Sequence, residues 1–337
     1  FLHGGVGADV QVPKNASLIN LRVSRSLIAP VPIAKYLRQT RPNLVISMPW
    51  MVNLAVCLAK TISRWPGTLI VTEHSSPIYT SEIEFRHNVK VRLYPWMAHY
   101  LYGAADGIVA VSRHTYDAVK QMIPNLSDRR LVVIPPPLDV QRIQRLRQEP
   151  VEHPWLATKE KPVIVAAGRL ESRKAFDVLI KAFSLVIREM DTRLIIFGEG
   201  PLRKQLELLV KDLNLVDSVS LPGHVRNLVS HVARSDVFAL SSEEEGFGLV
   251  LAEAMACGIP VVATDCGGPR DLLGGGDELC GILVPVNRPE ALARAILETL
   301  RNEDQRRQMI VGGKRRVTEM TPQNIASRYL EFAHKVK

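Results

Sequence analysis

The chain has 337 residues, 46% of them hydrophobic and 23% charged, with a formal net charge of +9. This composition is that of a soluble globular protein, and the length suffices for two α/β domains of ordinary size. No run of about 20 apolar residues occurs, and we recognise no signal peptide, so we expect a cytoplasmic protein rather than a membrane-spanning one. The four cysteines form no CxxC pair, which predicts reduced thiols and argues against a zinc site.

The positive charge is concentrated in the first half of the chain. Residues 1–150 carry 18 Lys and Arg against 9 Asp and Glu, whereas residues 151–337 carry 25 of each. A basic half favours an anionic partner such as acidic lipid, phosphorylated saccharide or nucleic acid, and a merely soluble basic surface is the alternative. No nucleic-acid-binding motif is present, so we expect no nucleic-acid partner.

Strands and helices alternate along the first half, which predicts a parallel sheet with crossover helices. No apolar strand precedes Gly4, Gly5 and Gly7, so the opening residues do not predict the strand and glycine-rich loop that begin a Rossmann-like domain. The predicted strands are residues 18–21, 44–47, 68–72, 107–111 and 132–134, and the predicted helices are residues 33–39, 53–62, 88–102 and 115–122.

One segment of this half, residues 86–96, mixes cations with Tyr and Trp. It could lie on an acidic membrane surface or form an ordinary amphipathic helix, and we expect Pro95 to kink it. Three prolines at 135–137 then interrupt the alternation. After them we expect a short helix within residues 141–154 and a linker at 148–160.

The second half restarts the alternation of strands and helices. The predicted strands are residues 163–167, 194–197, 219–221, 237–240 and 259–262. The predicted helices are residues 176–188, 202–213, 289–301, 304–317 and 324–333. Ligands of open α/β sheets gather at the carboxyl ends of the strands, so the residues that follow each strand are the candidates for a site.

Residues 241–264, SSEEEGFGLVLAEAMACGIPVVAT, are the most informative stretch. Gly246 and Gly248 open a predicted helix that Gly258 ends. We expect Glu245 at the entrance of this helix and Glu253 about two turns in, roughly on the same face. A helix entrance suits a phosphate and a carboxylate suits the hydroxyls of a sugar, so the pair indicates a nucleotide-sugar site. Two surface glutamates beside a glycine turn are the alternative.

The spacing Glu245-x7-Glu253 within EGFGLVLAEAMACGIPVVAT resembles the signature of the GT4-like retaining GT-B glycosyltransferases, which build bacterial glycans and lipopolysaccharide. The resemblance implies the GT-B fold, in which two Rossmann-like α/β domains with parallel sheets face an interdomain cleft. The expected parts are an acceptor-side domain over residues 1–147, incomplete at its start, a linker at 148–160, a donor domain over 161–320, and a helix over 321–337 that crosses back to the first domain.

The resemblance also implies roles for individual residues. Glu253 would accept hydrogen bonds from the ribose of the donor, and Glu245 would contact the transferred sugar. Arg169 and Lys174, in Gly168-Arg169-Leu170-x3-Lys174, would hold the donor's diphosphate, because cations can neutralise the charge of the leaving group. The remaining donor-binding candidates are His224, Val225, Gly246, Phe247, Gly248 and Leu249, although we favour a structural loop role over a catalytic one for His224.

In the first half, His74 follows the strand predicted at residues 68–72 and matches a histidine that the family carries there. A neutral imidazole in that place would hydrogen-bond a donor-sugar hydroxyl. Arg113 follows the strand at 107–111 and is a candidate acceptor contact or a surface residue. The catalytic candidates are therefore His74, Arg169, Lys174 and Glu245.

These assignments predict retaining transfer of a sugar from a nucleotide sugar, UDP-linked in preference to GDP-linked, to a glycan or lipid-linked acceptor. The family works without a metal ion, and we expect no metal or other cofactor. The basic half predicts peripheral contact with the inner face of an anionic cytoplasmic membrane. A GT-B phosphorylase and a catalytically silent sugar-nucleotide-binding module remain as alternatives.

Overall fold

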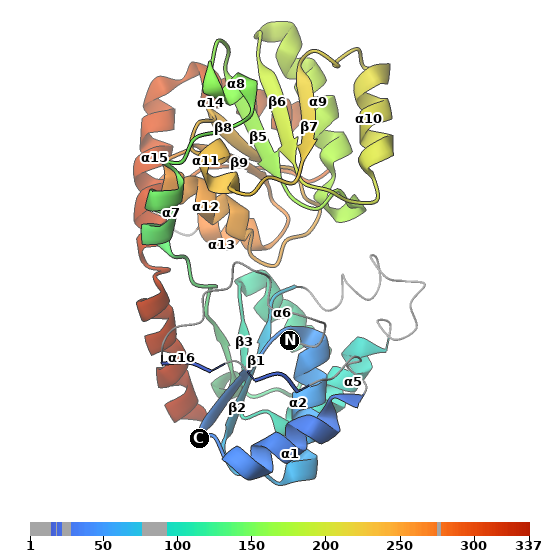
Figure 1. The fold of residues 1–337 in the computed structure, drawn as a ribbon, viewed down its shortest axis with the longest axis vertical. Helices are drawn as coiled ribbons and strands as arrows, with labels where there is room; N and C mark the ends of the chain where they lie inside the picture. The colour runs from blue at the N-terminus through green and yellow to red at the C-terminus, as the bar shows by residue number, and fades with distance from the viewer. Residues whose placement is uncertain (1–14, 18, 22–27, 76–92, 275–277) are drawn as a thin grey trace. The chain divides into compact units, whose positions relative to one another are not determined.

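The computed structural model describes residues 15–17, 19–21, 28–75, 93–274 and 278–337 (Figure 1). The chain divides into two compact units, which are described separately. The first comprises Phe1–Val111, Thr115–Ile134 and Arg328–Lys337, and the second comprises Ser112–His114 and Pro135–Ser327. The glycines at positions 4, 5 and 7 lie outside the described residues.

The first unit contains a parallel four-stranded sheet in the order β1-β2-β3-β4. Its strands are β1 (Leu44–Ser47), β2 (Thr68–Glu73), β3 (Gly107–Ala110) and β4 (Leu131–Val133). Every residue of β2 and β3 is buried, as expected of a parallel sheet. These four strands were predicted from the sequence. The strand predicted at 18–21 is wrong where it can be seen, since residues 19–21 form no strand, and residue 18 lies outside the described residues.

The described residues before β4 form the α-helices α1 (Pro30–Thr40), α2 (Trp50–Ser63), α5 (Tyr94–Leu101) and α6 (Arg113–Met122). Short 3-10 turns, η3 (Tyr102–Ala104) and η4 (Asp128–Arg130), precede β3 and β4. Pro95 does not kink a longer helix as predicted. It lies in the first turn of α5, where its missing N–H removes no helical hydrogen bond. Residues 88–92 of the predicted helix lie outside the described residues.

The second unit contains a parallel six-stranded sheet in the order β10-β9-β8-β5-β6-β7. Its strands are β5 (Val163–Ala167), β6 (Arg193–Phe197), β7 (Val219–Gly223), β8 (Val237–Leu240), β9 (Val261–Thr264) and β10 (Ile282–Val284). Sequence analysis missed β10, whose three residues are too few for a recognisable pattern. It also placed the start of β9 two residues early, at Ile259, which is bonded instead to the carbonyl of Ala254 at the end of the preceding helix.

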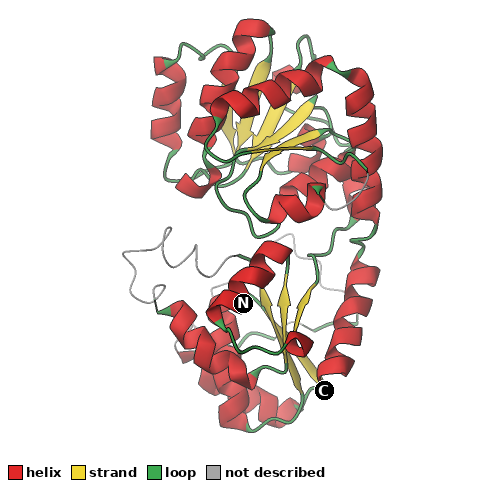
Figure 2. Ribbon diagram, turned by 180° about the vertical axis from the view of Figure 1, so that it is seen from behind, coloured by secondary structure: helices red, strands yellow, loops and turns green. Residues whose placement is uncertain are grey.

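Helices lie on both faces of this sheet (Figure 2). On one face α9 and α14 pack in a core that includes Ile164, Leu194 and Ile196. The opposite face carries α12, which contacts β8 and β9. The helices of this unit are α7 (Val140–Leu146), α8 (Pro154–Ala157), α9 (Phe176–Glu189), α10 (Arg203–Asp212), α11 (Leu228–Val232), α12 (Leu249–Cys257), α13 (Gly268–Leu273), α14 (Pro289–Arg301) and α15 (Glu303–Thr318). The last helix, α16 (Pro322–Val336), begins in this unit and continues into the first one from Arg328.

The strand order of the second unit reverses beside β5. From β5 the chain runs outward through β6 and β7, and it then returns to place β8 on the other side of β5. Loops at the carboxyl ends of two such strands diverge over opposite faces of the sheet, which leaves a crevice where open α/β sheets bind ligands. The fold therefore brings together the loop after β5, residues 168–175, and the loop after β8, residues 241–248.

Candidate active site at the β5–β8 strand ends

Two side-chain and backbone hydrogen bonds join the loop after β5 to the loop after β8. Ser241 Oγ donates to the carbonyl of Lys174 at 2.8 Å, and the Glu243 N–H donates to the carbonyl of Arg173 at 2.8 Å. Both carbonyls belong to the short 3-10 turn η5 (Ser172–Lys174). These bonds fix the turn that carries the two cations against the segment that carries the carboxylates.

Lys174 and Glu245, separated by 70 residues in the sequence, form an ion pair at this junction. The Lys174 ammonium donates to Glu245 Oε1, and Ser242 Oγ donates to the same oxygen at 2.8 Å. The two charged side chains are only 13% and 10% exposed. Water therefore screens their attraction weakly. The structure thus brings together two of the four residues predicted to be catalytic.

Arg169 and Arg173 share the carboxylate of Glu171. Arg173 Nε donates to Glu171 Oε1 at 2.7 Å, and Arg169 Nε lies 3.5 Å from Glu171 Oε2. A second carboxylate, that of the buried Glu244, lies 3.8 Å from Arg173 Nη1. Arg173 is thus tied to both loops, whereas the Arg169 side chain is 70% exposed and accessible to a ligand.

The predicted helix after the glycines is present as α12, which ends at the left-handed Gly258 as expected. Glu245 lies at the entrance of this helix, as predicted, because Gly248, at φ +88°, is the N-cap residue that follows it. Glu245 forms an isolated parallel β-bridge with Gly267, whereas Glu253 is a residue of the helix.

Glu253 is half-buried, and its burial raises the pKa of its carboxyl above 4.5, while the nearby Arg142 of α7 lowers it. A carboxylate whose charged form is poorly hydrated gains more from new hydrogen-bond donors than an exposed one does. Such donors are what the paired hydroxyls of a ribose offer. Glu253 makes no contact with Lys174 among the described interactions, so it forms a separate part of the site.

The other donor-binding candidates are arranged around these groups. Gly168 follows β5, and His224 and Val225 follow β7, with His224 exposed and Val225 half-buried. Gly246, Phe247 and Gly248 are buried between Glu245 and α12, and Leu249, the first residue of α12, is exposed. These placements agree with a site along the strand ends and leave the individual roles untested.

His74 and Arg113 follow β2 and β3, and both are exposed. The imidazole of His74 nevertheless loses part of its hydration to surrounding protein atoms, which lowers its pKa below 6.5 and favours the neutral form. The neighbouring Glu73 is 1% exposed and accepts hydrogen bonds from Tyr94 at 2.6 Å, from Tyr102, and from Asn53 at 3.2 Å. This polar cluster anchors the end of the strand that His74 follows.

Sequence reasoning missed Ser242, Arg173 and the Glu73 cluster. Ser242 could have been noticed as a hydroxyl three residues before Glu245, but serines of this kind are common in loops. The cluster around Glu73 combines α2, β2, α5 and η3, and no local pattern in the sequence indicates that these segments meet.

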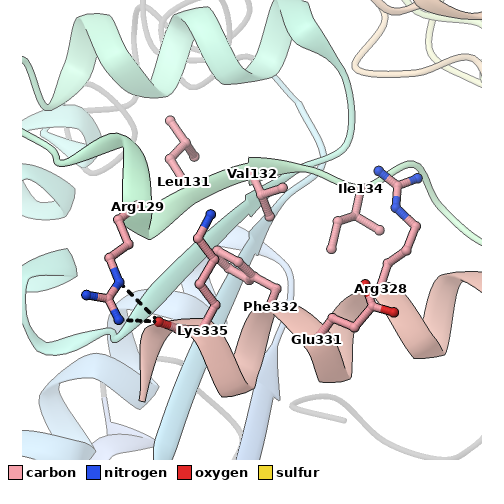
Figure 3. Close-up of a pocket in the computed structure, with 8 residues that line it drawn as sticks. All are labelled: Arg129, Leu131, Val132, Ile134, Arg328, Glu331, Phe332 and Lys335. Carbon is pink, nitrogen blue, oxygen red and sulfur yellow. Dashed lines mark hydrogen bonds between the residues drawn. The ribbon is translucent and has the colours of Figure 1, made fainter.

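A cavity of about 220 Å³ lies between β4 and α16 in the first unit (Figure 3). Its two arginines are already engaged with the backbone. Arg129 Nη2 donates to the carbonyl of Lys335 at 2.9 Å, and Arg328 Nη2 donates to the carbonyl of Val133 at 2.7 Å. None of the predicted site residues lines this cavity, which we interpret as a gap in the packing of the last helix.

The described residues contain neither a metal-binding cluster of side chains nor a helix fit to cross a membrane. No group of three or more His, Cys, Asp and Glu side chains in the described ranges could hold a metal ion. Within the same ranges, no helix has both the length and the apolar character needed to span a bilayer.

Comparison with known proteins places these features in a family. Residues 148–316 match the family described as glycosyl transferases group 1, and residues 5–142 match the family described as Glycosyltransferase Family 4. The solved structure of Anabaena HepE with UDP and glucose matches with a TM-score of 0.74 at 21% identity, over 89% of this chain and 80% of that one. Such structural neighbours are GT-B glycosyltransferases, which confirms the predicted fold class.

Two relatives have similar sequence identity to this chain. The Campylobacter jejuni N-acetylgalactosamine-N,N'-diacetylbacillosaminyl-diphospho-undecaprenol 4-alpha-N-acetylgalactosaminyltransferase is 30% identical over 71% of this chain and 62% of its own length. The Mycobacterium tuberculosis GDP-mannose-dependent alpha-(1-6)-phosphatidylinositol monomannoside mannosyltransferase is 31% identical over 56% of this chain and 51% of its own length. This chain thus spans between half and two thirds of these relatives. By its sequence match and its fold, the chain belongs to the glycosyl transferases group 1 family.

Proposed function

We propose that this protein transfers a sugar from a nucleotide-sugar donor to a hydroxyl group of a glycan or lipid-linked acceptor, with retention of the anomeric configuration. The observation that carries the proposal is the meeting of Lys174 and Glu245 at the strand ends of β5 and β8. A cation for a diphosphate and a carboxylate for a sugar are thereby within one crevice of the sheet.

In the proposed reaction, the bond between the anomeric carbon and the diphosphate oxygen breaks as the acceptor oxygen bonds to the same face of that carbon. The electron pair of the broken bond goes to the nucleoside diphosphate, and the acceptor's proton passes to an oxygen of this leaving group. Lys174 and Arg169 stabilise the negative charge that develops there, so the step needs no metal ion. Glu245 hydrogen-bonds the sugar, and Glu253 accepts from the ribose hydroxyls.

We propose UDP as the nucleotide carrier in preference to GDP. HepE was solved with UDP and glucose, whereas the name of the mycobacterial relative specifies GDP-mannose, so both bases occur among similar proteins. A thermal-shift panel of UDP- and GDP-sugars decides between them, because a ligand that binds the folded state raises its apparent stability.

A lipid-linked acceptor at an anionic membrane is the partner we propose for the first unit. The C. jejuni relative acts on a diphospho-undecaprenol substrate, according to its name. In this chain, Trp96 and Tyr100 of α5 are 63% and 65% exposed, and their rings are 5.0 Å apart. Exposed Trp and Tyr side chains suit the interface between lipid headgroups and acyl chains, and the basic first half adds attraction to anionic lipid. We propose residues 1–147 as the acceptor-side domain and residues 161–320 as the donor domain.

The test of transfer combines calorimetry with turnover and product analysis. Binding of a UDP-sugar together with transfer to a lipid-linked or glycan acceptor, in the presence of EDTA and with retained configuration by NMR, supports the proposal. Binding without transfer to any acceptor supports the silent module instead. Release of a sugar phosphate when inorganic phosphate is the acceptor supports the phosphorylase. Lys181→Ala is a suitable control variant for the site cations, because Lys181 pairs with Asp177 on the surface of α9.

A further inference from the structure

If the proposed function is correct, the ammonium group of Lys174 has two anionic partners, the carboxylate of Glu245 and the diphosphate of the donor. The ammonium donates to Glu245 Oε1, and the same ammonium is assigned to the donor's diphosphate. Both side chains are largely removed from solvent. A diphosphate and a carboxylate that approach one weakly screened cation repel each other, so close contact with one partner weakens contact with the other.

The backbones of both residues are held in place. The Lys174 carbonyl accepts from Ser241 Oγ at 2.8 Å, and its N–H donates to the carbonyl of Glu171 at 3.1 Å. The Glu245 N–H donates to the carbonyl of Cys266 at 3.2 Å, and its carbonyl accepts from the Gly268 N–H at 2.8 Å. The ion pair can therefore open by rotation of the two side chains, without displacement of either loop.

Ser242 gives Glu245 a second donor that does not depend on Lys174. Its hydroxyl lies 2.8 Å from Glu245 Oε1, and its carbonyl accepts from Thr264 Oγ1 at 2.6 Å, which ties the serine to β9. When Lys174 turns toward a diphosphate, this hydroxyl continues to hold the carboxylate within the site. The carboxylate is then available to the hydroxyls of the transferred sugar.

We propose that Glu245 competes with the nucleoside diphosphate for Lys174 and thereby lowers the affinity of the protein for this product of the reaction. As the diphosphate leaves, the ammonium returns to the carboxylate, and the cation is not left unpaired in a poorly hydrated position. The donor itself suffers less from the competition, because its sugar offers Glu245 hydroxyl donors in exchange. The proposal rests on the proposed function, and it adds a role in product release to the residue assigned to the sugar.

The decisive variant is Glu245→Gln, which keeps the shape of the side chain and removes its charge. Calorimetry with UDP, and with GDP as a second probe, measures the result. We expect the variant to bind the diphosphate about five- to tenfold more tightly than the wild type, because the ammonium is released and a repulsive charge is gone. We expect the preference for UDP-glucose over UDP to fall at the same time, because Gln is a weaker acceptor for the sugar.

Two control variants distinguish competition for Lys174 from a general change in the electrostatic potential of the site. Glu243→Gln removes the same charge two residues away, where the carboxylate accepts from Asn287 at 2.9 Å. Asp177→Asn removes the carboxylate of the exposed pair with Lys181. Both are expected to leave UDP affinity within about twofold of the wild type, because the described partners of these carboxylates are Asn287 and Lys181 and not Lys174. In a Lys174→Met background, Glu245→Gln should lose most of its effect, because a double-mutant cycle isolates the pair.

If Glu245→Gln binds UDP no more tightly than the wild type does, the proposed competition is wrong. The proposal that the protein transfers a sugar from a nucleotide sugar is not affected by this result. An increase of the same size in Glu243→Gln also overturns the competition, since the effect would then be a matter of net charge. If neither UDP nor GDP binds to the wild type or to any variant, the proposed function falls, and the competition falls with it.

Discussion

The N–H of Gly268 donates to the carbonyl of Glu245 at 2.8 Å, and this bond fixes the start of α13 against the glycine turn before α12. The glycine turn after Glu245 lies so close to Gly268 that a side chain on Gly268 has no space. A Cβ placed there would lie 2.4 Å from Phe247 Cα and 2.5 Å from the carbonyl oxygen of Gly246. Since both of these are backbone atoms, neither can move aside cheaply.

Gly268→Ala should therefore displace the turn at residues 246–248. We expect a loss of unfolding free energy of about 1–3 kcal/mol, typical of overpacking, and a weaker affinity for the nucleotide sugar. Gly103→Ala is the matched control, because a Cβ there meets no atom within 4 Å. Urea unfolding and calorimetry measure both effects, and equal behaviour of the two variants would show that the turn tolerates displacement.

Lys174→Ala should reduce the turnover number by about 100-fold or more, by analogy with the loss of one electrostatic contact in a transition state. The charge on the leaving diphosphate grows as the bond breaks, so the loss should appear in kcat more than in KM. Steady-state kinetics of Lys174→Ala beside Lys181→Ala provide the measurement. A near-normal kcat would refute the assignment of Lys174 to the leaving group.

Glu253→Ala should weaken donor binding by about tenfold, since it removes an acceptor for the ribose hydroxyls. These contacts act in the ground state and the transition state alike, so KM should rise while kcat changes little. Calorimetry with UDP measures the effect directly. A 2′-deoxy analogue, which lacks one of the two hydroxyls, should show a smaller difference in affinity between wild type and variant. Unchanged UDP affinity in Glu253→Ala would count against the ribose contact.

Glu73→Leu should destabilise the protein by about 2–4 kcal/mol, because it leaves the buried hydroxyls of Tyr94 and Tyr102 without this acceptor. Glu73→Gln retains an acceptor and should lower the unfolding free energy by less than Glu73→Leu does. Urea unfolding of the three proteins at pH 7 gives the comparison. Equal losses in the two variants would indicate that the shape of the side chain matters and the hydrogen bonds do not.

The same residue predicts a dependence of stability on pH. Burial raises the pKa of Glu73 above its ordinary 4.5, so the folded protein holds this proton more tightly than the unfolded chain does. The contribution of Glu73 to the unfolding free energy is therefore greatest at low pH, and it declines as pH rises from about 4.5 through the raised value. Gln cannot ionise, so Glu73→Gln should lack this part of the decline above pH 4.5. Parallel pH curves for both proteins would contradict the prediction.

The double variant Trp96→Ala/Tyr100→Ala should bind anionic vesicles about tenfold more weakly than the wild type, because two exposed aromatic side chains are lost from α5. Sedimentation with vesicles that contain phosphatidylserine measures the binding, which should also weaken as salt rises. Leu208→Ala/Val216→Ala, two exposed apolar residues of the second unit, is the control. Equal binding to neutral vesicles would remove the reason to place the acceptor at a membrane.

The fold was largely predictable from the sequence because its strands are short apolar runs and its longer helices have regular apolar spacing. The helices α11 and α13 escaped prediction since they have only 5 and 6 residues. The pairing of Lys174 with Glu245 could not be predicted from the sequence for a different reason. It depends on β8 lying beside β5, and two strands, β6 and β7, separate them along the chain.

The glycines of this segment determine where its two glutamates lie. The left-handed conformation of Gly248 is incompatible with a helix interior, so the helix begins after it and Glu245 remains at the entrance, as predicted. The glycines that made the segment recognisable therefore also placed its two carboxylates on different structural elements.

The hydrogen bond between α16 and β4 predicts how a chain shortened at its C-terminal end would behave. β4 ends its sheet, and the carbonyl of Val133 receives the guanidinium of Arg328 instead of another strand. A chain cut before Arg328 would present that strand as a template for pairing with a second molecule. The shortened protein would therefore aggregate in a concentration-dependent manner, whether or not its active site were intact.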